Sequence, residues 1–139
     1  MKKLFSTRTS ENAFSFAMLV LRVGLGLLML VNHGLDKIMH FAQKSSRFAD
    51  PFNIGSTTSL SLVVFAEFFC AAFIILGLFT RLAAIPLIIV MGVAFVVAHD
   101  MQYRGGPGGG ETALLFLIGF TVIMIAGPGR MSLDRFIGK

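Results

Sequence analysis

Residues 60–98 read LSLVVFAEFFCAAFIILGLFTRLAAIPLIIVMGVAFVVA, and this stretch decides the fold. It holds two apolar runs rich in Leu, Ile, Val and Phe, and neither run alternates between apolar and polar residues. An apolar run of about 20 residues is long enough to cross a bilayer as a helix. The link between the two runs is short and contains Gly77 and Arg81. We therefore predict two antiparallel membrane-spanning helices joined by a tight turn.

Two further apolar runs flank this hairpin, so that four runs take up most of the 139 residues. The chain is 55% hydrophobic and 14% charged, compared with about 25% charged residues in soluble domains. A soluble protein of this length buries only about 70% of the surface that its chain exposes, which excludes a soluble globular domain. The sequence predicts an all-α integral membrane bundle of four transmembrane helices, in a single domain over residues 1–139. We expect these helices at about 13–35, 58–79, 82–99 and 111–126.

The basic residues predict the orientation of the bundle. The net charge is +5, but the Lys and Arg residues lie mostly outside the apolar runs, which favours a role in topology over nucleic-acid binding. With four spans, seven of them fall on the side of the two termini and four on the other side, which predicts both termini in the cytoplasm. The first run is not expected to be a cleaved signal peptide, because Arg22 interrupts it and no small-residue cleavage site follows.

Two features of the sequence exclude enzyme classes. Cys70 is the one cysteine, so the chain cannot form an internal disulfide or act as a self-contained thiol–disulfide enzyme. The glycine-rich segment 105–110 lacks the Gly-Lys-Ser/Thr sequence of a phosphate-binding loop and follows no strand pattern. We expect this segment to be a flexible outer connection.

Two ionisable residues lie well inside the apolar runs, Arg22 in the first and Glu67 in the second. Because such residues are costly in a bilayer, we expect both to face the bundle interior and to be linked, directly or through one polar group or water. Two alternatives stay open: Arg22 could extend to the cytoplasmic headgroups, and Glu67 could be a neutral carboxyl bonded to a neighbouring helix. Gly24 and Gly26 would let another helix approach closely.

Most other titratable residues gather at the predicted outer ends of the helices. His33, His99 and Glu111 come from three different helices at similar depth, and we expect them to face a common cavity that opens outward. Two His residues and a carboxylate could begin a metal or haem site, and nearby Met residues would suit copper, but we assign no metal ligand because no dense ligand spacing is present. Hydrated interfacial side chains or a structural hydrogen-bond cluster are the alternatives, and Glu111 could simply favour the start of its helix.

An ordered series of short motifs carries a family resemblance. The motifs are Leu21-Arg22 with Gly26, His33-Gly34 with Lys37, Ala66-Glu67, residues 76–84, His99, residues 109–115, and Gly127-Pro128-Gly129 with Ser132-Leu133-Asp134. This series resembles the DoxX-like membrane proteins over about residues 19–134. The resemblance implies a four-helix protein of the bacterial inner membrane, with relatives linked to thiosulfate:quinone oxidoreductase and to oxidative-stress complexes. It also implies that the recurrent polar positions form one site: Arg22, His33, Lys37, Glu67, His99 and Glu111.

Two functions are compatible with these residues. The first is a subunit of a quinone-linked redox system, whose electrons come from a soluble or membrane-bound redox partner because the chain shows no electron-carrier motif. Its catalytic residues would be Glu67, His99 and Glu111, and its ligand-binding residues Arg22, His33 and Lys37. The cofactor stays unassigned, with quinone considered first and haem or copper left open. The second function is a non-enzymatic membrane protein that binds or passes a small molecule or assists assembly; in either case the lipid bilayer is a partner and a homo-oligomer is compatible.

Overall fold

The computed structural model describes residues 10–102 and 109–138, and these residues form helices and no strand, which confirms the all-α class. Three continuous helices are long and apolar enough to cross a membrane, and a fourth apolar helix has 17 residues. They are Glu11–Met39, Ser56–Leu76, Thr80–Ala98 and Gly110–Ala126. A helix of 17 residues is about 26 Å long, close to the lower limit for a span.

The first long helix consists of α1 (Glu11–Met29), the π-helical segment η1 (Leu30–Gly34) and α2 (Leu35–Met39). The side chain of Ser10 accepts a hydrogen bond from the Ala13 amide at 3.1 Å and so caps the first turn. The helix continues past the expected end at about residue 35, because η1 and α2 follow α1 without a break. A short helix, α3 (Phe41–Lys44), comes next.

The second long helix also contains a π-helical segment. It runs through α4 (Ser56–Val64), η2 (Phe65–Cys70) and α5 (Ala71–Leu76). It ends at Leu76, three residues before the predicted boundary, and is followed by Gly77, whose φ of +68° and ψ of 41° are left-handed. Glycine adopts this conformation without the steric cost of a side chain, so it terminates the helix and starts the turn.

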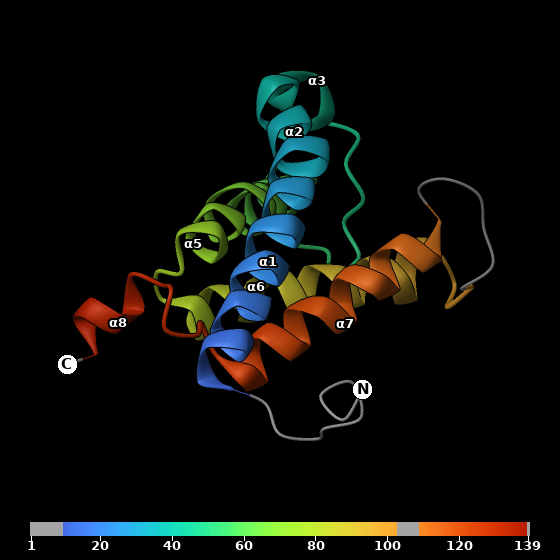
Figure 1. The fold of residues 1–139 in the computed structure, drawn as a ribbon. Helices are drawn as coiled ribbons and strands as arrows, with labels where there is room; N and C mark the ends of the chain where they lie inside the picture. Colours follow the sequence, from blue (N-terminus) through green and yellow to red (C-terminus); the bar gives the residue numbers. More distant parts are fainter. Residues whose placement is uncertain (1–9, 103–108, 139) are drawn as a thin grey trace.

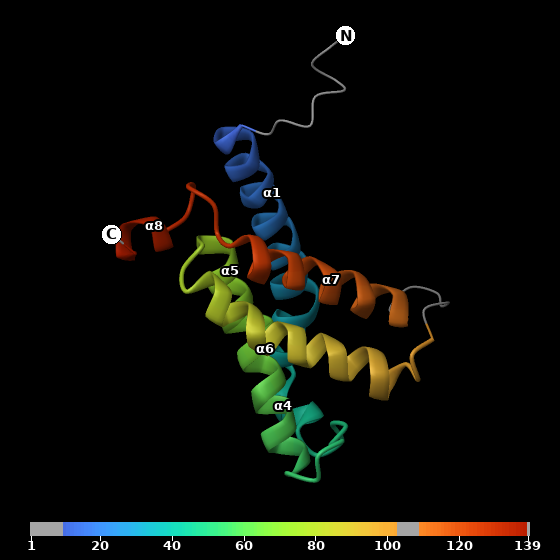
Figure 2. The same cartoon turned by 90° about the horizontal axis from the view of Figure 1, so that it is seen from below.

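The C-terminal half begins with a helical hairpin. The third long helix comprises α6 (Thr80–Val93) and the π-helical η3 (Ala94–Ala98), and α7 (Gly110–Ala126) returns alongside α6. Figure 2 shows α6 and α7 side by side. The chain ends with the short helix α8 (Asp134–Ile137). The glycine-rich connection predicted to be flexible lies almost wholly outside the described residues.

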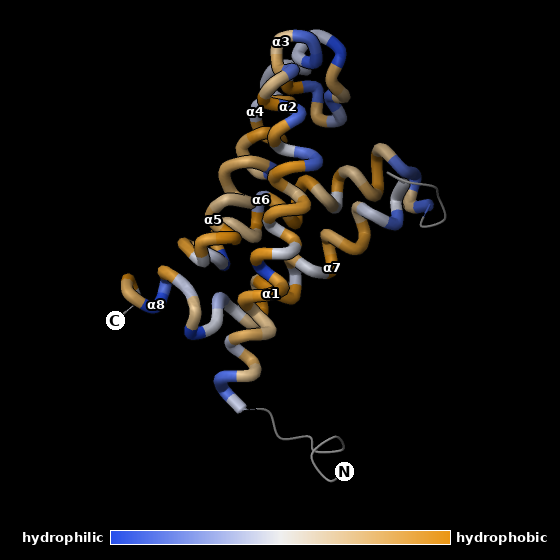
Figure 3. Tube along the Cα trace, turned by 45° about the horizontal axis from the view of Figure 1, so that its top comes forward, coloured by the Kyte–Doolittle hydropathy of each residue, from blue (hydrophilic) through white to orange (hydrophobic). Residues whose placement is uncertain are grey.

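Two helical pairs make up the molecule (Figure 1). The helix containing α1 packs on α5, and the α6–α7 hairpin crosses this pair, with α6 against η2 and α7 against α1. A core of buried apolar side chains, including Met29, Ile74, Leu87 and Phe120, fills the crossing. Figure 3 shows that hydrophobic residues follow the long helices, whereas hydrophilic residues gather around α3 and near α8. Many large apolar side chains on the outer helix faces are exposed, as expected of faces that contact lipid.

Candidate functional site

A cavity of about 450 Å³ is lined by residues from all three π-helical segments, η1, η2 and η3. Its walls come from the first long helix, the loop before α4, the α4–η2 segment, the α6–η3 segment and the start of α7. Most lining side chains are apolar. The polar lining side chains are His33, Lys37, Ser59, Glu67, His99 and Thr112. A concave, mostly apolar space with a few convergent polar groups is typical of small-molecule sites.

Lys37 and Glu67 form an ion pair in this cavity. Lys37 Nζ donates to Glu67 Oε2 at 2.6 Å, and the side chains are only 17% and 5% exposed. Lys37 lies on α2 and Glu67 on η2, so the pair joins the first two long helices. Each charge is largely removed from water, and each therefore depends on the other for stabilisation.

Gly34 explains why η1 and η2 can approach closely enough for this pair. A Cβ atom added at Gly34 would lie 2.5 Å from the carbonyl oxygen of Glu67 and 2.9 Å from Cα of Phe68. Only a residue without a side chain permits this backbone contact. Lys37 lies nearly one turn further along the same helix, within reach of the Glu67 carboxylate.

Three of the cavity-forming segments are π-helical, and sequence reasoning missed them. His33 lies in η1, Glu67 in η2, and His99 directly follows η3. π-helical turns are rare, and they are frequent at functional sites. The sequence carries no simple signal for them, because a π-turn arises from the packing of a helix against its neighbours.

His33 and His99 both line the cavity, as the sequence predicted. The His33 ring packs edge-on against Phe116 of α7, with ring centroids 5.7 Å apart and an interplanar angle of 87°. This edge-on contact helps to fix the orientation of the imidazole ring. His99 is partly buried and ends the third long helix.

Glu111 does not belong to the cavity, so the prediction of a site shared by His33, His99 and Glu111 is wrong for this residue. Thr112 and Phe116 line the cavity from α7, whereas Glu111 is exposed. Glu111 begins a stripe that continues with the exposed Leu115 and Ile118. Residues spaced by four and three share one helical face, and this face points away from the cavity.

Arg22 and Glu67 both face the interior, as predicted, with 0% and 3% exposure, but they are not bonded to each other, so the direct form of the predicted link is wrong. Glu67 pairs with Lys37 instead. The Arg22 guanidinium donates to the carbonyl oxygens of Ile74 at 3.0 Å, Ile75 at 3.3 Å and Met131 at 2.6 Å. Full burial also contradicts the alternative in which Arg22 extends to the headgroups. Arg22 is not among the residues that line the cavity.

The contacts of Arg22 give it a structural role. The last carbonyl groups of a helix lack partners within the helix and carry partial negative charge, so a cation at the end of α5 is favourable. The Met131 contact adds the C-terminal segment to the same junction. Nearby, the Asp134 carboxylate accepts hydrogen bonds from the amides of Phe79 at 2.6 Å and Thr80 at 2.9 Å, capping α6.

The small residues of α1 behave differently from each other. At Gly26 an added Cβ would lie 2.6 Å from Ile75 Cγ1 and 3.2 Å from the Ala71 carbonyl oxygen, so α5 does approach closely there. Gly24 has nothing within 4 Å of an added Cβ, and the expected close approach at this residue is therefore wrong.

Asp50 organises the loop that covers the cavity, and the sequence analysis missed it. Its carboxylate accepts hydrogen bonds from the Ser59 hydroxyl at 2.8 Å and from the amides of Ile54 at 3.0 Å and Gly55 at 2.7 Å. The bond from Ser59, followed by those from Gly55 and Ile54, lowers the pKa of Asp50 below its ordinary value of 3.8. An Asp followed a few residues later by Gly and Ser before an apolar run is a signal that could have identified this loop closure.

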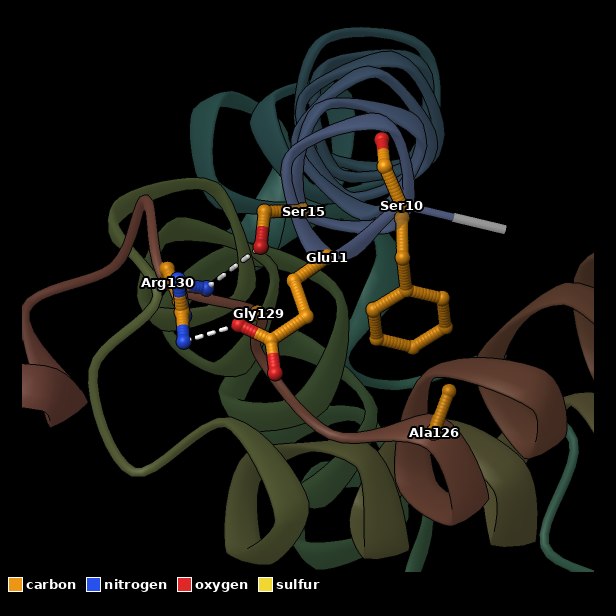
Figure 4. Close-up of a pocket in the computed structure, with 7 residues that line it drawn as sticks. Ser10, Glu11, Ser15, Ala126, Gly129 and Arg130 are labelled. Atoms are coloured by element: carbon orange, nitrogen blue, oxygen red, sulfur yellow. Dashed lines mark hydrogen bonds and ion pairs between the residues drawn. The ribbon is translucent and has the colours of Figure 1, made fainter. Parts of the chain in front are cut away.

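A second hollow, of about 350 Å³, lies at the start of α1 (Figure 4). The Arg130 side chain forms an ion pair with Glu11, and the Arg130 amide donates to Ser15 Oγ at 3.2 Å. These contacts attach the segment after α7 to the start of α1. The Arg130 and Glu11 side chains are 57% and 72% exposed, so the ion pair lies at the surface and contributes little to stability.

Within residues 10–102 and 109–138, no group of three or more His, Cys, Asp or Glu residues is arranged to hold a metal ion. Lysine, histidine and glutamate side chains can bind, orient and exchange protons with a ligand in the cavity, but they do not carry electrons.

The long apolar helices define the chain as an α-helical integral membrane protein. The DoxX family model matches residues 17–100, and the chain belongs to the DoxX family. An uncharacterized membrane protein of Mycobacterium tuberculosis is 31% identical over 137 residues, covering 88% of this chain and 82% of that relative. An uncharacterized protein of Haemophilus influenzae is 30% identical over 101 residues, covering 71% of this chain and 67% of that protein. No solved structure matches the chain at a significant level.

Proposed function

We propose that this DoxX-family protein binds a molecule of the quinone class in the cavity between η1, η2 and η3, as the membrane subunit of a redox system. The observation that carries this proposal is the arrangement of His33, His99 and the Lys37–Glu67 pair around one mostly apolar space of about 450 Å³. A quinone has an apolar ring with polar oxygens, and such a cavity offers walls for the ring and hydrogen-bond partners for the oxygens.

The residues divide the chemistry between them. His33 or His99 can donate a hydrogen bond to a quinone oxygen, and Glu67 and Lys37 can exchange protons with it. Reduction of a quinone to a quinol requires two electrons and two protons. The side chains of the cavity supply sites for the protons, and a soluble or membrane-bound redox partner supplies the electrons. Arg22 and Glu111 have no part in this proposal because neither lines the cavity.

The second candidate is a binding or assembly protein without a redox step. The Lys37–Glu67 pair favours it, because the pair also joins two helices and would stabilise the bundle with the cavity filled by any small apolar molecule. The two candidates differ in one observable. A redox subunit changes the oxidation state of its bound quinone when the partner is present, whereas a binder leaves it unchanged.

The test is a binding measurement on the whole chain. Protein purified in mild detergent is extracted and analysed for quinones by mass spectrometry, and thermal unfolding is followed with a thiol-reactive fluorophore and an added short-chain quinone. Cys70 is 2% exposed and is the one cysteine, so its reaction reports unfolding. We expect quinone to raise the unfolding temperature of the wild type and not of His33→Leu. Glu111→Gln is the matched control outside the cavity and keeps the wild-type response.

Two results would overturn this proposal. One is a preparation without quinone whose unfolding temperature does not change when quinone is added. The other is an equal response of His33→Leu and the wild type, which would place the quinone elsewhere on the protein.

We further propose that the protein lies in the bacterial inner membrane with both termini in the cytoplasm, which places the cavity near the periplasmic side. The excess of basic residues on the side of the termini supports this orientation. A reporter fused after Lys139 is expected to behave as cytoplasmic, and one inserted near Asn53 as periplasmic. A periplasmic signal from the C-terminal fusion would contradict the orientation.

A further inference from the structure

We propose that the ligand of this cavity is an uncharged molecule with an apolar chain, and that it enters sideways from the bilayer through a mouth between α4 and the α6–η3 segment. This inference concerns the site of the proposed function and rests on it for the location of binding. Beyond the proposed function, it specifies that the headgroup of the ligand is uncharged, that the ligand carries an apolar chain, and that the ligand reaches the cavity from the bilayer.

The charges of the cavity balance each other. Lys37 and Glu67 are bonded at 2.6 Å, and among the described residues no other Lys, Arg, Asp or Glu lines the space. An anionic ligand would have to take Lys37 away from Glu67 and leave a buried carboxylate without its partner, which is costly. A cationic ligand would have to take Glu67 away from Lys37, and it would leave the largely buried ammonium group of Lys37 without its partner. The site therefore favours a headgroup that forms hydrogen bonds without carrying charge.

Arg22 might have been the cation for an anionic ligand, but the structure uses it elsewhere. Its guanidinium is fully buried and bonded to the carbonyl oxygens of Ile74, Ile75 and Met131. Among the described residues, an anionic ligand would therefore have only Lys37 as a cation in the cavity, and Lys37 is already neutralised by Glu67.

The mouth is formed by apolar side chains that line the cavity and are also more than half exposed. Leu62 on α4 is 55% exposed, Ile89 on α6 is 56% exposed and Val97 on η3 is 51% exposed. All three lie within helices that are long and apolar enough to cross the membrane. Exposed apolar side chains on such helices face lipid, so the opening between them leads into the bilayer.

The arrangement of the helices produces this opening. η2 packs against α6, and from this crossing α4 and the later part of the third long helix diverge (Figure 2). The loop over the other side of the cavity presents apolar side chains as well, among them Phe48, Pro51 and Phe52. Among the described residues, both routes present mostly apolar side chains, which favours an apolar ligand over a water-soluble ion.

The size of the cavity limits how much of the proposed ligand it can enclose. At about 450 Å³ it lies toward the lower end of the range of about 300–1,000 Å³ for small-molecule pockets. A ring-sized headgroup can lie beside Lys37 and Glu67, and a long chain must then leave through the mouth. There it would contact Leu62 and Ile89 on its way into the lipid.

The experiment compares ligands with and without a chain in lipid nanodiscs. The probes are the ubiquinone headgroup without a tail, the same headgroup with a decyl chain, a monoacylglycerol and dodecyl phosphate, each at a defined ratio to lipid. The mouth variants are Leu62→Trp and Ile89→Trp. Their matched controls are Phe65→Trp and Ile85→Trp, exposed apolar positions on the same two helices that do not line the cavity.

We expect the mouth variants to weaken binding of the decyl probe about tenfold, as when about two methylene groups lose their apolar contact. The tail-less headgroup should change less than twofold, and the control variants should bind both probes as the wild type does. The dodecyl phosphate should bind more weakly than the uncharged probes. Equal losses in mouth and control variants, or unchanged binding of the decyl probe, would overturn the lateral mouth. If dodecyl phosphate bound more tightly than the uncharged probes, the proposal of an uncharged headgroup would be wrong.

Failure of the inference can be distinguished from failure of the proposed function. If monoacylglycerol binds with the expected variant pattern and neither quinone binds, the quinone function fails and this inference stands. If both quinones bind and the mouth variants do not change their binding, the lateral mouth fails and the quinone function stands. Should the tryptophan variants not fold, a decyl quinone with a photoreactive group at the end of its chain is used on the wild type. Labels within residues 56–65 and 89–98 support the mouth, and labels confined to other segments overturn it.

Discussion

The partner of Glu67 can be tested by a double-mutant cycle with Lys37→Met and Glu67→Gln. The structure places Lys37 Nζ 2.6 Å from Glu67 Oε2, with side-chain exposures of 17% and 5%. At this distance two unit charges attract by about 6 kcal/mol for an effective dielectric constant of about 20. Much of this attraction is offset by the cost of removing both charges from water.

The asymmetry between single and double variants gives the expected magnitude. Either single variant leaves one buried charge without a partner, which should lower the free energy of unfolding by about 3–5 kcal/mol. The double variant has no buried charge at this place. It should therefore be more stable than the sum of the two losses predicts, by about 2–3 kcal/mol.

The assay is reversible unfolding in mixed micelles, followed by circular dichroism for the four proteins of the cycle. Lys37→Met combined with Glu111→Gln is the control, because Glu111 is exposed and lies outside the cavity, and these two losses should add. Additive losses for Lys37 and Glu67 would refute the ion pair. A coupling between Arg22 and Glu67 of similar size would instead restore the link that the sequence suggested.

Three further predictions concern helix contacts and the loop. Arg22→Met should lower the free energy of unfolding by about 3–5 kcal/mol in the same assay, because three carbonyl groups lose charged hydrogen-bond donors; an unchanged midpoint would refute this role. Gly34→Ala should cost about 1–3 kcal/mol because its Cβ meets the η2 backbone, whereas Gly24→Ala, with open space, should be neutral or slightly stabilising; equal effects would contradict the close contact. The bond from Ser59 lowers the pKa of Asp50 in the folded protein below the ordinary value of 3.8. The ionised Asp50 carboxylate therefore contributes fully to loop stability above pH 3.8, and this contribution is lost as the pH falls through the lowered pKa of the folded state. Hydrogen exchange of the amides of residues 54–55, corrected for the intrinsic pH dependence, should lose protection only in that acid range, and a loss near neutral pH would count against it.

Much of the fold could be predicted from the sequence because it depends on local properties. Hydropathy and run length decide that a segment crosses a bilayer, and both are visible along the chain. The cost of a charge in lipid likewise predicted that Arg22 and Glu67 face the interior, which the structure confirms. The resemblance to DoxX-like proteins rested on motifs in order, and the family match confirms it.

The partners of the interior residues could not be predicted in the same way. Arg22 contacts carbonyl groups 52 and 109 residues further along the chain, and these meet only because the turn after α5 and the C-terminal segment converge on α1. Composition alone does not tell which cation of the first helix pairs with a carboxylate of the second helix. The choice of Lys37 over Arg22 depends on where η1 and η2 touch, and Gly34 determines that place.

The rotation of α7 shows the same limit. This helix is apolar on all sides, so its sequence pattern does not indicate which face is buried, and Glu111 was assigned to the cavity by its depth and by the family resemblance. The structure turns Thr112 and Phe116 inward and Glu111 outward. By itself, the sequence determined which segments enter the membrane, because transfer into lipid depends on each segment's own composition. Only the tertiary structure decided which side chains share the cavity, because the rotation and close approach of the helices depend on how their surfaces pack together.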